Sequence, residues 1–473
     1  MPNKLNYSLD EEVGNKIFYD NDSIKHILTK KLGEGGQGAV YRTKDKNIAI
    51  KLLIDKSGRP ITDINTYKAF SESIDNIRIL PLTKLNIAKP TSLLQSPYCG
   101  YTLRLLEDMI PIKELIKPNS ENLAKFYIES GGLKKRLLVL AKASEILARI
   151  HAKSIAYADI SQNNIFISES IDNFEVWLID CDNLRFISDK ATRIYTPGFG
   201  APEVVKALSG NTVLSDIYSF AILAYYTLVQ AHPFLGEMVE NAGGWDQSNS
   251  ENDDMENKAY SGDLPWVGDE SDNENYSEKG IPRDKILTKS ILNLFKKTFE
   301  EGRNDKTQRP GLSIWSENFR KAADLTLKCK NCSSTYYANL DKCPFCNEDR
   351  PGFILINVRR YDPETEELFG NKTIWAKSIN LDEDDFIYNY HVRPSIFRED
   401  IEKVFELKHT KNGLKIEQKD SNSYYLYDKI GNFKKIDNTL ILEKNDQAII
   451  ICGDENSNCR YLTIKYYRAT NEN

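Results

Sequence analysis

The sequence lacks a basic excess, an N-terminal apolar core and internal repeats. Its 473 residues include 63 Lys and Arg against 69 Asp and Glu, a net charge of −6, which argues against a nucleic-acid partner. The first residues, MPNKLNYSLDEEVG, contain no signal-peptide core, and we expect a cytoplasmic protein. A chain this long exceeds one ordinary core, so the 40% of apolar residues indicates a globular protein of about two to four domains.

Long hydrophobic runs are also scarce, and only one segment resembles a membrane span. Residues 217–235, IYSFAILAYYTLVQAHPFL, have about the right length but include Ser219, Gln230 and Pro233. A helix that is apolar all round and shorter than about 20 residues is more often buried in a protein core. We therefore predict a buried helix over residues 212–231 and no membrane partner.

Cysteine is sparse except in one cluster. Four of the eight cysteines lie in residues 329–346, CKNCSSTYYANLDKCPFC, with the spacing C-x2-C-x10-C-x2-C. Close pairs of this kind indicate metal binding in a reducing compartment, whereas a disulfide framework distributes its cysteines. Four thiolates leave no open position on a tetrahedral ion, which predicts a structural Zn²⁺ site. Its ligands would be Cys329, Cys332, Cys343 and Cys346.

The hydrophobic pattern changes along the chain. Residues 28–54 alternate as strand, Gly-rich turn and strand, and residues 133–151 carry apolar residues at helical spacing. Residues 241–280 hold 11 Asp or Glu against two Lys, which predicts a solvated acidic insertion or long loop. After residue 351, short apolar runs between polar turns predict an all-β module.

A glycine-rich turn lies between the first strands. The segment KLGEGGQGAVYR contains the pattern G-x-G-x-x-G-x-V at Gly33, Gly35, Gly38 and Val40. A dinucleotide-binding turn would open a helix, but the flanking segments AVYRT and NIAIKLL indicate strands, which favours a flap over phosphates. Lys51 lies 13 residues past Gly38, where it would point under the flap and neutralise nucleotide phosphates.

Three oxygen-bearing side chains follow in the middle of the sequence. Asp159 and Asn164 stand five residues apart in AYADISQNNIFI, and Asp180 ends the apolar run of VWLIDCDNL. Two carboxylates and one amide carbonyl form a set of oxygen ligands that suits Mg²⁺. We therefore expect a metal-dependent phosphoryl-transfer site.

With the segments TPGFGAPE and QRPGLSIW further on, residues 28–325 resemble the eukaryotic-type Ser/Thr protein kinase family of bacteria. The resemblance implies an α+β protein with a bilobal kinase fold, followed by a zinc ribbon and an all-β sandwich-like domain. The implied parts are an N-terminal extension (1–27), a kinase domain (28–326, N-lobe to about 106, acidic insertion 241–280), a zinc ribbon (327–350) and a β-rich domain (351–473).

The resemblance also implies an ATP site between the two lobes. The flap residues Gly33, Gly35, Gly38 and Val40 would cover the phosphates, and the adenine hinge would comprise Leu103, Arg104 and Leu106. Lys51 would hold the α- and β-phosphates. Its ion-pair partner would be Glu72, although Asp75 is nearly as well placed.

The remaining motif residues would serve catalysis and structure. Asp159 would orient the substrate hydroxyl and accept its proton, while Asn164 and Asp180 would hold Mg²⁺, with Mn²⁺ as a substitute. Three further residues have structural roles in the family: the ion pair Glu203–Arg309 and Asp216, which would tether the catalytic loop.

The sequence departs from the family in its catalytic loop. Tyr157 and Ala158 replace His and Arg, Ser161 replaces a Lys, and DCD replaces Asp-Phe-Gly. Each candidate oxygen ligand, Lys51 and the candidate base remain, so an active kinase is the leading hypothesis. The alternatives are a nucleotide-binding pseudokinase scaffold without catalysis, a small-molecule kinase, and a nucleic-acid adaptor built on the ribbon.

The C-terminal residues are loosely similar to forkhead-associated domains. The Arg and the Ser-x-x-His with which that family binds phosphothreonine are not evident, so a docking role is the simpler interpretation. A trailing Cys-rich ribbon resembles that of bacterial kinases that work with a von Willebrand-type protein and a PP2C-type phosphatase. Protein substrates and these two partners are the expectation that follows.

The cysteine spacing leads to a direct prediction. Protein purified without added metal should contain about one zinc ion per chain by elemental analysis. Cys343→Ser should release the zinc and lower the thermal stability of the C-terminal half, because metal binding supplies folding free energy. Cys459→Ser, outside the cluster, should retain the metal. Fresh protein without zinc would contradict the ribbon.

Overall fold

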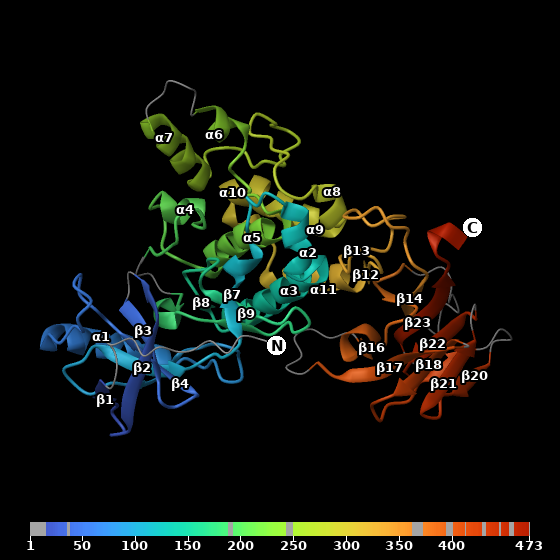
Figure 1. Ribbon diagram of the computed structural model, residues 1–473, viewed down its shortest axis with the longest axis horizontal. Helices are drawn as coiled ribbons and strands as arrows, with labels where there is room; N and C mark the ends of the chain where they lie inside the picture. Colours follow the sequence, from blue (N-terminus) through green and yellow to red (C-terminus); the bar gives the residue numbers. More distant parts are fainter. Residues whose placement is uncertain are drawn as a thin grey trace.

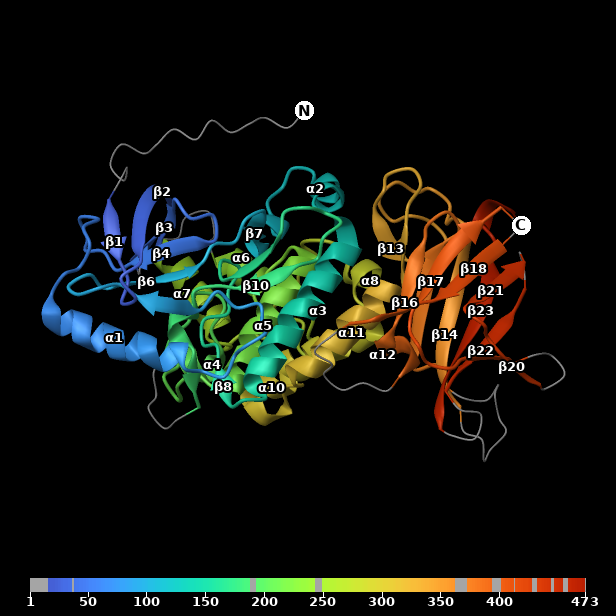
Figure 2. The ribbon, with the colours of Figure 1, turned by 90° about the horizontal axis from the view of Figure 1, so that it is seen from below.

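The computed structural model describes residues 16–35, 38–187, 193–242, 249–361, 372–393, 401–411, 413–427, 432–443, 446–453 and 458–472. Three parts follow one another along the longest axis (Figure 1). An N-terminal sheet occupies one end, a helical part lies in the middle, and β-sheets occupy the other end. The view from below shows the same order, with α1 beneath the N-terminal sheet and α11 leading toward the C-terminal strands (Figure 2).

The N-terminal part is a six-stranded antiparallel sheet with the order β1-β2-β3-β4-β6-β5. Its strands are β1 (Ile17–Tyr19), β2 (Lys25–Gly35), β3 (Gly38–Thr43), β4 (Ile48–Leu52), β5 (Pro90–Leu93) and β6 (Gly100–Arg104). Helix α1 (Ile64–Arg78) joins β4 to β5 and begins at Asp63, whose carboxylate accepts a hydrogen bond from the Thr66 N–H at 2.7 Å. The predicted strand–turn–strand arrangement around the glycines is thus present.

The helical part contains the long helices α3 (Gly132–His151), α5 (Val213–Val229) and α11 (Leu312–Asp324), with the shorter α9 (Lys289–Lys296). One apolar cluster joins them. Short strands lie where this part meets the N-terminal sheet: β7 (Met109–Pro111), β8 (Ile155–Ala156), β9 (Ile165–Ser168), β10 (Val176–Leu178) and β11 (Arg185–Phe186). Strand β9 lies between β7 and β10, and β8 pairs with β11.

Helix α5 is the buried helix that the sequence predicts. Its cap at Thr212 and Ser215 is reciprocal, and 14 of its 17 residues are buried. Two polar residues of the segment 217–235 have buried partners: Gln230 Nε2 donates to the Leu115 carbonyl, and His232 Nε2 donates to the Gly198 carbonyl, each at 2.8 Å. Among the described residues, no helix has the length and hydrophobicity to cross a membrane.

The expectation of a solvated insertion at 241–280 is wrong for its second half. After α6 (Glu237–Ala242) and α7 (Asn249–Tyr260), the chain returns to the helical part, and Trp266 is 1% exposed. Its indole N–H donates to Glu300 at 2.9 Å. Asp263, Asp272 and Glu274 are exposed, but the short apolar segment LPWV anchors this part of the chain, with Leu264, Trp266 and Val267 buried. Residues 243–248 lie outside the described residues.

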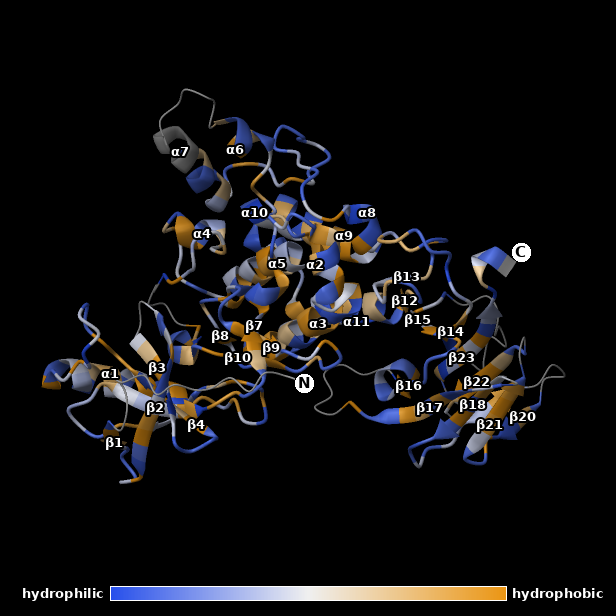
Figure 3. Ribbon diagram, viewed as in Figure 1, coloured by the Kyte–Doolittle hydropathy of each residue, from blue (hydrophilic) through white to orange (hydrophobic). Residues whose placement is uncertain are grey.

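The C-terminal residues form two antiparallel sheets, with strand orders β15-β14-β23-β22-β19-β20 and β16-β17-β18-β21. The strands of the first sheet are β14 (Phe353–Tyr361), β15 (Trp375–Asn380), β19 (Tyr425–Tyr427), β20 (Phe433–Lys435), β22 (Ala448–Cys452) and β23 (Cys459–Tyr467). Those of the second are β16 (Asp385–Tyr388), β17 (Lys403–Thr410), β18 (Gly413–Gln418) and β21 (Thr439–Glu443). One apolar cluster contains residues of both sheets, as in a sandwich. Hydrophobic and hydrophilic residues alternate along these strands (Figure 3).

A buried carboxylate connects the helical part to the C-terminal sheets. Asp324, the last residue of α11, accepts hydrogen bonds from Trp375 Nε1 at 2.8 Å, Lys377 Nζ at 3.0 Å and His391 Nε2 at 2.9 Å. Lys377 Nζ also lies 3.0 Å from Asp385. Burial raises the pKa of Asp324, but the charge of Lys377 and the His391 contact outweigh it and hold that pKa below its usual range.

The tautomer of His391, on α12 (Asn389–Val392), follows from its two neighbours. Nδ1 accepts the Tyr388 N–H at 3.0 Å while Nε2 donates to Asp324, so the ring is neutral. Burial lowers the pKa of His391, against the opposing charge of Asp324. A proton on Nδ1 would remove the acceptor of the Tyr388 N–H.

This junction should make stability depend on pH. In the unfolded chain His391 takes up a proton below about pH 6.5, whereas in the folded chain burial keeps it neutral to lower pH. The contribution of His391 to the free energy of unfolding therefore declines as the pH falls through that range. His391→Gln should lower the free energy of unfolding by roughly 1–3 kcal/mol at pH 7.5, because a buried polar group loses its partner, and by less at pH 5.5. Trp375→Phe removes a hydrogen-bond donor to Asp324 that does not titrate, so it should lower the free energy of unfolding by the same amount at both pH values. Thermal unfolding measures the differences, and a constant gap for His391→Gln would contradict the assignment.

Candidate functional site

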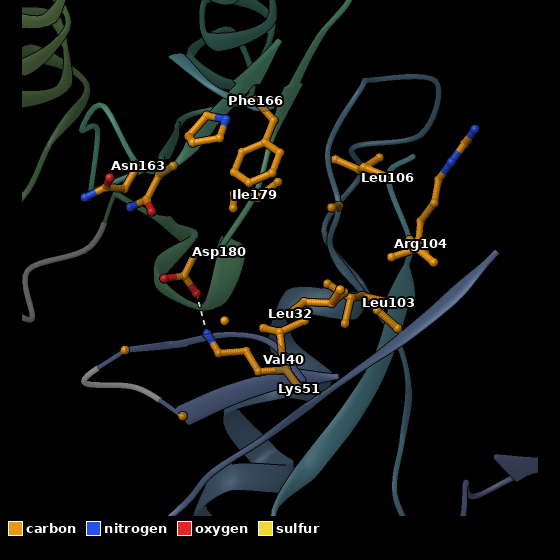
Figure 4. Close-up of a pocket in the computed structure, with 18 of the residues that line it drawn as sticks. Leu32, Val40, Lys51, Leu103, Arg104, Leu106, Asn163, Phe166, Ile179 and Asp180 are labelled. Atoms are coloured by element: carbon orange, nitrogen blue, oxygen red, sulfur yellow. Dashed lines mark hydrogen bonds and ion pairs between the residues drawn. The ribbon is translucent and has the colours of Figure 1, made fainter. Parts of the chain in front are cut away.

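A cavity of about 670 Å³ lies between the N-terminal sheet and the helical part. The flap contributes Gly33, Gly35 and Gly38, and apolar side chains from both sides include Leu32, Val40, Leu103, Phe166 and Ile179. Figure 4 shows Leu32, Val40 and Leu103 on the sheet side, facing Phe166 and Ile179 across the space. Polar side chains gather at one end, where Lys51, Asp159, Asn164 and Asp180 line the cavity. The site therefore combines an apolar slot with a charged end.

Glycine is required in the flap at Gly38. Its φ angle is +127°, and a Cβ atom there would lie 2.3 Å from the carbonyl oxygen of Leu52. The β2–β3 turn can thus approach β4 only because this residue has no side chain. Residues 36 and 37, at the tip, lie outside the described residues.

The expected hinge residues line the cavity at the end of β6 and just after it. Leu103 and Leu106 are among its apolar residues. Arg104 is exposed, and its guanidinium lies over the Trp177 ring, 4.5 Å from the ring centre. Its side chain is therefore engaged outside the slot, and the Arg104 backbone is the part that a bound base could contact.

Lys51 projects from β4 toward two carboxylates. Its Nζ atom contacts Asp180, drawn as the dashed line in Figure 4, and lies 2.6 Å from Asp182 Oδ2. The Tyr101 hydroxyl donates to the other oxygen of Asp182. Burial lowers the pKa of Lys51, but the charges of Asp182 and Asp180 outweigh burial and raise it above its ordinary value.

The expected pairing of Lys51 with Glu72 is wrong. Glu72 is exposed on α1, and Asp75 instead pairs with Arg78 at 2.6 Å. The helix turns apolar residues inward: Ile74 is buried, and the Phe70 ring stacks on Tyr101. Helical position alone could not show which face α1 turns inward. The sequence pattern did not identify Asp182 as a partner of Lys51, because DCD differs from Asp-Phe-Gly most visibly in the Phe and Gly that it lacks.

Hydrogen bonds hold both oxygens of the Asp159 carboxylate. Asn164 Nδ2 donates to Oδ2 at 3.0 Å and to the Asp159 carbonyl at 2.9 Å, while the Thr196 hydroxyl donates to Oδ1 at 2.9 Å. Burial raises the pKa of Asp159, and the nearby Asp180 charge adds to this, against the two hydrogen bonds. Thr196 is a residue that sequence reasoning missed, although TPGFGAPE was recognised.

Asp216 holds the loop that carries Asp159. Its carboxylate accepts the N–H groups of Tyr157 at 2.7 Å and Ala158 at 3.0 Å, and the His151 ring lies 3.1 Å away. Ala158 adopts a φ angle of +75°, which a residue with a side chain rarely takes unless other contacts impose it. The Tyr157 hydroxyl donates to the Ile179 carbonyl, which ties the loop to the chain before Asp180.

Glu203 and Arg309 form a bidentate pair with distances of 2.7 and 2.8 Å. The Arg309 side chain is fully buried and also donates to the carbonyls of Gly302 and Leu214. Burial raises the pKa of Glu203, but Arg309 outweighs it and lowers that pKa. The pair joins the segment after Thr196 to the residues just before α11, so it helps to hold the segment that carries Thr196.

The four cluster cysteines meet in space, with all Sγ atoms within 4.8 Å of one another. The Cys329–Cys346 and Cys332–Cys343 sulfur distances are 3.5 and 3.7 Å, close to the roughly 3.8 Å edge that Zn–S bonds of about 2.3 Å impose on a tetrahedron. The donor set therefore fits Zn²⁺. Strands β12 (Thr326–Lys328) and β13 (Thr335–Tyr337) flank the first cysteine pair.

The cysteine cluster docks on the helical part. Thr335 Oγ1 accepts the Lys134 N–H at 2.9 Å, at the first turn of α3, and the Tyr337 hydroxyl donates to the Ile286 carbonyl at 2.9 Å. The Phe345 ring stacks on Tyr127 with 5.7 Å between ring centres.

A two-lobed fold with a glycine flap, a buried lysine and an Asp–Asn–Asp set at one end of an apolar slot defines the protein kinase class. Comparison with known families agrees: the sequence model of the protein kinase domain matches residues 27–312. The chain therefore belongs to the protein kinase family.

Curated relatives include serine/threonine kinases of bacteria. The DNA damage-responsive serine/threonine-protein kinase RqkA of Deinococcus radiodurans is 25% identical over 225 residues, 45% of this chain and 31% of the relative. PkaA of Streptomyces coelicolor is 24% identical over 234 residues, 45% of this chain and 40% of the relative. Pkn2 of Myxococcus xanthus is 31% identical over 115 residues, 23% of this chain and 14% of the relative. The chain thus spans well under half the length of these relatives.

The Thr196–Asp159 hydrogen bond leads to a prediction. Thr196→Asp should reduce phosphoryl transfer by at least about 10²-fold, because a second carboxylate beside Asp159 disfavours its ionised form and displaces the acceptor hydroxyl. Thr196→Ser, which keeps the donor, should retain most activity. The exposed Thr83→Asp is the matched control in a steady-state transfer assay. Full activity of Thr196→Asp would show that the hydrogen bond is dispensable.

Proposed function

We propose that the chain is an ATP- and Mg²⁺-dependent serine/threonine protein kinase that transfers the γ-phosphoryl group to protein hydroxyls. The observation that carries the proposal is the meeting of Lys51, Asp159, Asn164 and Asp180 at the charged end of an apolar slot. The names of the curated relatives support the same class of reaction. An apolar slot of this volume accommodates a purine base, and its charged end suits the phosphates.

Asn164 and Asp180 would hold the metal. Because Asn164 Nδ2 donates to Asp159, its Oδ1 atom is the acceptor that a cation would use. Oxygen ligands suit Mg²⁺ or Mn²⁺, which neutralise phosphate charge when bound. Lys51 would compensate further phosphate charge from the sheet side, under the flap.

Asp159 would act on the acceptor hydroxyl. Thr196 and Asn164 hold its carboxylate in one orientation, so an incoming hydroxyl can donate to it and lose its proton there as the oxygen attacks phosphorus. The raised pKa of Asp159 makes it a better proton acceptor than an exposed carboxylate. Its fixed position supplies the orientation that such a transfer requires.

The altered catalytic loop is compatible with this chemistry. Ala158 has no cation to bind a phosphorylated activation loop, so activity should not depend on such a contact. Ser161 is buried where the family keeps a lysine beside the γ-phosphate. The pseudokinase scaffold is the competing function, and it predicts nucleotide binding without transfer.

We assign the Cys cluster a structural Zn²⁺ and, with the C-terminal sheets, a docking or regulatory role. The fit of the four sulfur atoms and the docking on α3 support the metal assignment. Protein substrates follow from the kinase domain. A von Willebrand-type protein and a PP2C-type phosphatase are the proposed partners in a bacterial cytoplasm, on the resemblance of the trailing ribbon.

Labelled-ATP transfer to the protein itself and to generic protein substrates tests the function. Asp159→Asn should remove transfer by roughly 10²–10⁴-fold while leaving nucleotide binding nearly intact. Asp180→Asn should weaken Mg·ATP binding as well, and Lys51→Met should cut turnover sharply. Asp172→Asn, an exposed carboxylate, is the control.

The substitution Ser161→Lys tests whether the altered catalytic loop is active or inactive. Activity should be preserved or rise if Ser161 merely replaces a phosphate-steadying cation. Mg·ATP binding without transfer in the unmodified protein, unchanged by Asp159→Asn, would establish the scaffold instead.

A further inference from the structure

Asp182 occupies an unusual place in the cleft. It belongs to the short helical turn Cys181–Asn183, directly after the metal-side Asp180, and its side chain is 14% exposed. One carboxylate oxygen lies 2.6 Å from Lys51 Nζ, and the other accepts the Tyr101 hydroxyl. Two separate elements of the N-terminal sheet, β4 and β6, therefore hold this side chain in one orientation.

Helix α1 supplies no acidic partner to Lys51 among its described residues. Its inward positions are apolar, with Ile74 and Ile77 buried and Phe70 stacked on Tyr101. The acidic residues Glu72 and Asp75 are exposed. The carboxylate that holds Lys51 thus comes from the segment after Asp180.

Metal binding would separate the two carboxylates around Lys51. Asp180 would share its charge with the cation, and a bound cation repels the lysine ammonium. Asp182 would then be the remaining anion in contact with Lys51. Its bond to Tyr101 keeps it on the sheet side, beside the lysine and apart from the metal.

We propose that Asp182 is the positioning residue of Lys51, so that the phosphate-binding lysine is set by the segment after Asp180 and by β6, and not by α1. The proposal rests on the proposed function for its catalytic consequence. It also bears on regulation, because the described residues of α1 contribute no carboxylate to the Lys51 ion pair and reach it through the Phe70–Tyr101 stack. A switch that breaks this ion pair directly should therefore act on the segment that carries Asp180 and Asp182.

The first test measures the amine of Lys51 directly. Asp180 and Asp182 are the charged groups in contact with Lys51 Nζ. Removing an anion lowers the pKa of a lysine, so Asp182→Asn should shift the pH profile of Lys51 acylation by an amine-reactive reagent to lower pH. Glu72→Gln is the matched control and should leave the profile unchanged. Labelling is followed by peptide mass spectrometry on the full chain.

The second test measures turnover. Asp182→Asn should lower kcat/KM by about 10²-fold, the cost of a misplaced catalytic group, and Glu72→Gln should remain near the unmodified value. Asp182→Glu, which keeps the carboxylate, should retain more activity than Asp182→Asn. Tyr101→Phe should produce a smaller loss in the same direction, because it frees Asp182 without removing it.

A double-mutant cycle distinguishes positioning from other roles. In a Lys51→Met background, Asp182→Asn should cause no further loss of kcat/KM. A second loss of similar size, together with weaker Mg²⁺ dependence, would make Asp182 a metal ligand and overturn the proposal. An unchanged acylation profile in Asp182→Asn would overturn it as well.

The outcomes remain separable from the proposed function. If the unmodified protein binds nucleotide but transfers no phosphate, the kinase proposal fails, while the acylation profiles still decide whether Asp182 controls Lys51. If Asp182→Asn does not fold, as shown by thermal unfolding, the Tyr101→Phe profile decides the question. A Tyr101→Phe profile identical to that of the unmodified protein would then reject the proposal.

Discussion

Asp216 accepts the N–H groups of Tyr157 and Ala158 and contacts His151, although the residue is only 2% exposed. A buried carboxylate is tolerated only where hydrogen bonds replace its hydration, so the loop cannot detach without leaving a bare charge in the helical core. The Tyr157 hydroxyl donates to the Ile179 carbonyl, so the same loop also holds the chain just before Asp180. The positions of Asp159 and Asp180 therefore both depend on one side chain of α5.

The cleft concentrates negative charge around one buried cation among its described residues. Asp180 and Asp182 contact Lys51 and raise its pKa against the effect of burial, while burial and the nearby Asp180 charge raise the pKa of Asp159. Such a site gains stability when a metal cation enters, because like charges within a few ångströms repel. The apolar slot beside it reduces screening by water, so a phosphate chain would interact strongly with each of these groups.

Different interactions attach the C-terminal half at two of its contacts. At Asp324, an ionised side chain is surrounded by Trp375, Lys377 and His391, which satisfy it inside the protein. At the cysteine cluster, the Phe345–Tyr127 ring stack and single hydrogen bonds join the cluster to the helical part. Breaking the first contact would strand a buried charge, whereas the second depends on the cluster keeping its shape.

The local patterns determined much of this protein. Glycine spacing, the Lys51 strand, the Asp159–Asn164 interval and the cysteine pairs are short-range features. The apolar periodicity of α3 and the long apolar run of α5 identified their helices. The same reasoning missed Trp266, because a four-residue apolar segment among acidic residues carries too little signal to predict burial. It also could not show that Thr196 reaches Asp159 across 37 residues of sequence.

Tertiary structure alone decided the partner of Lys51. Glu72 and Asp182 are both acids at plausible places in the sequence, and neither propensity nor spacing states which way α1 is rotated or where the turn after Asp180 projects. The rotation of α1 follows from packing Phe70 and Ile74 inward, which turns Glu72 to solvent, while the bond to Tyr101 draws Asp182 to the lysine. Both depend on contacts between residues remote in sequence, which form only when the sheet and the loop come together.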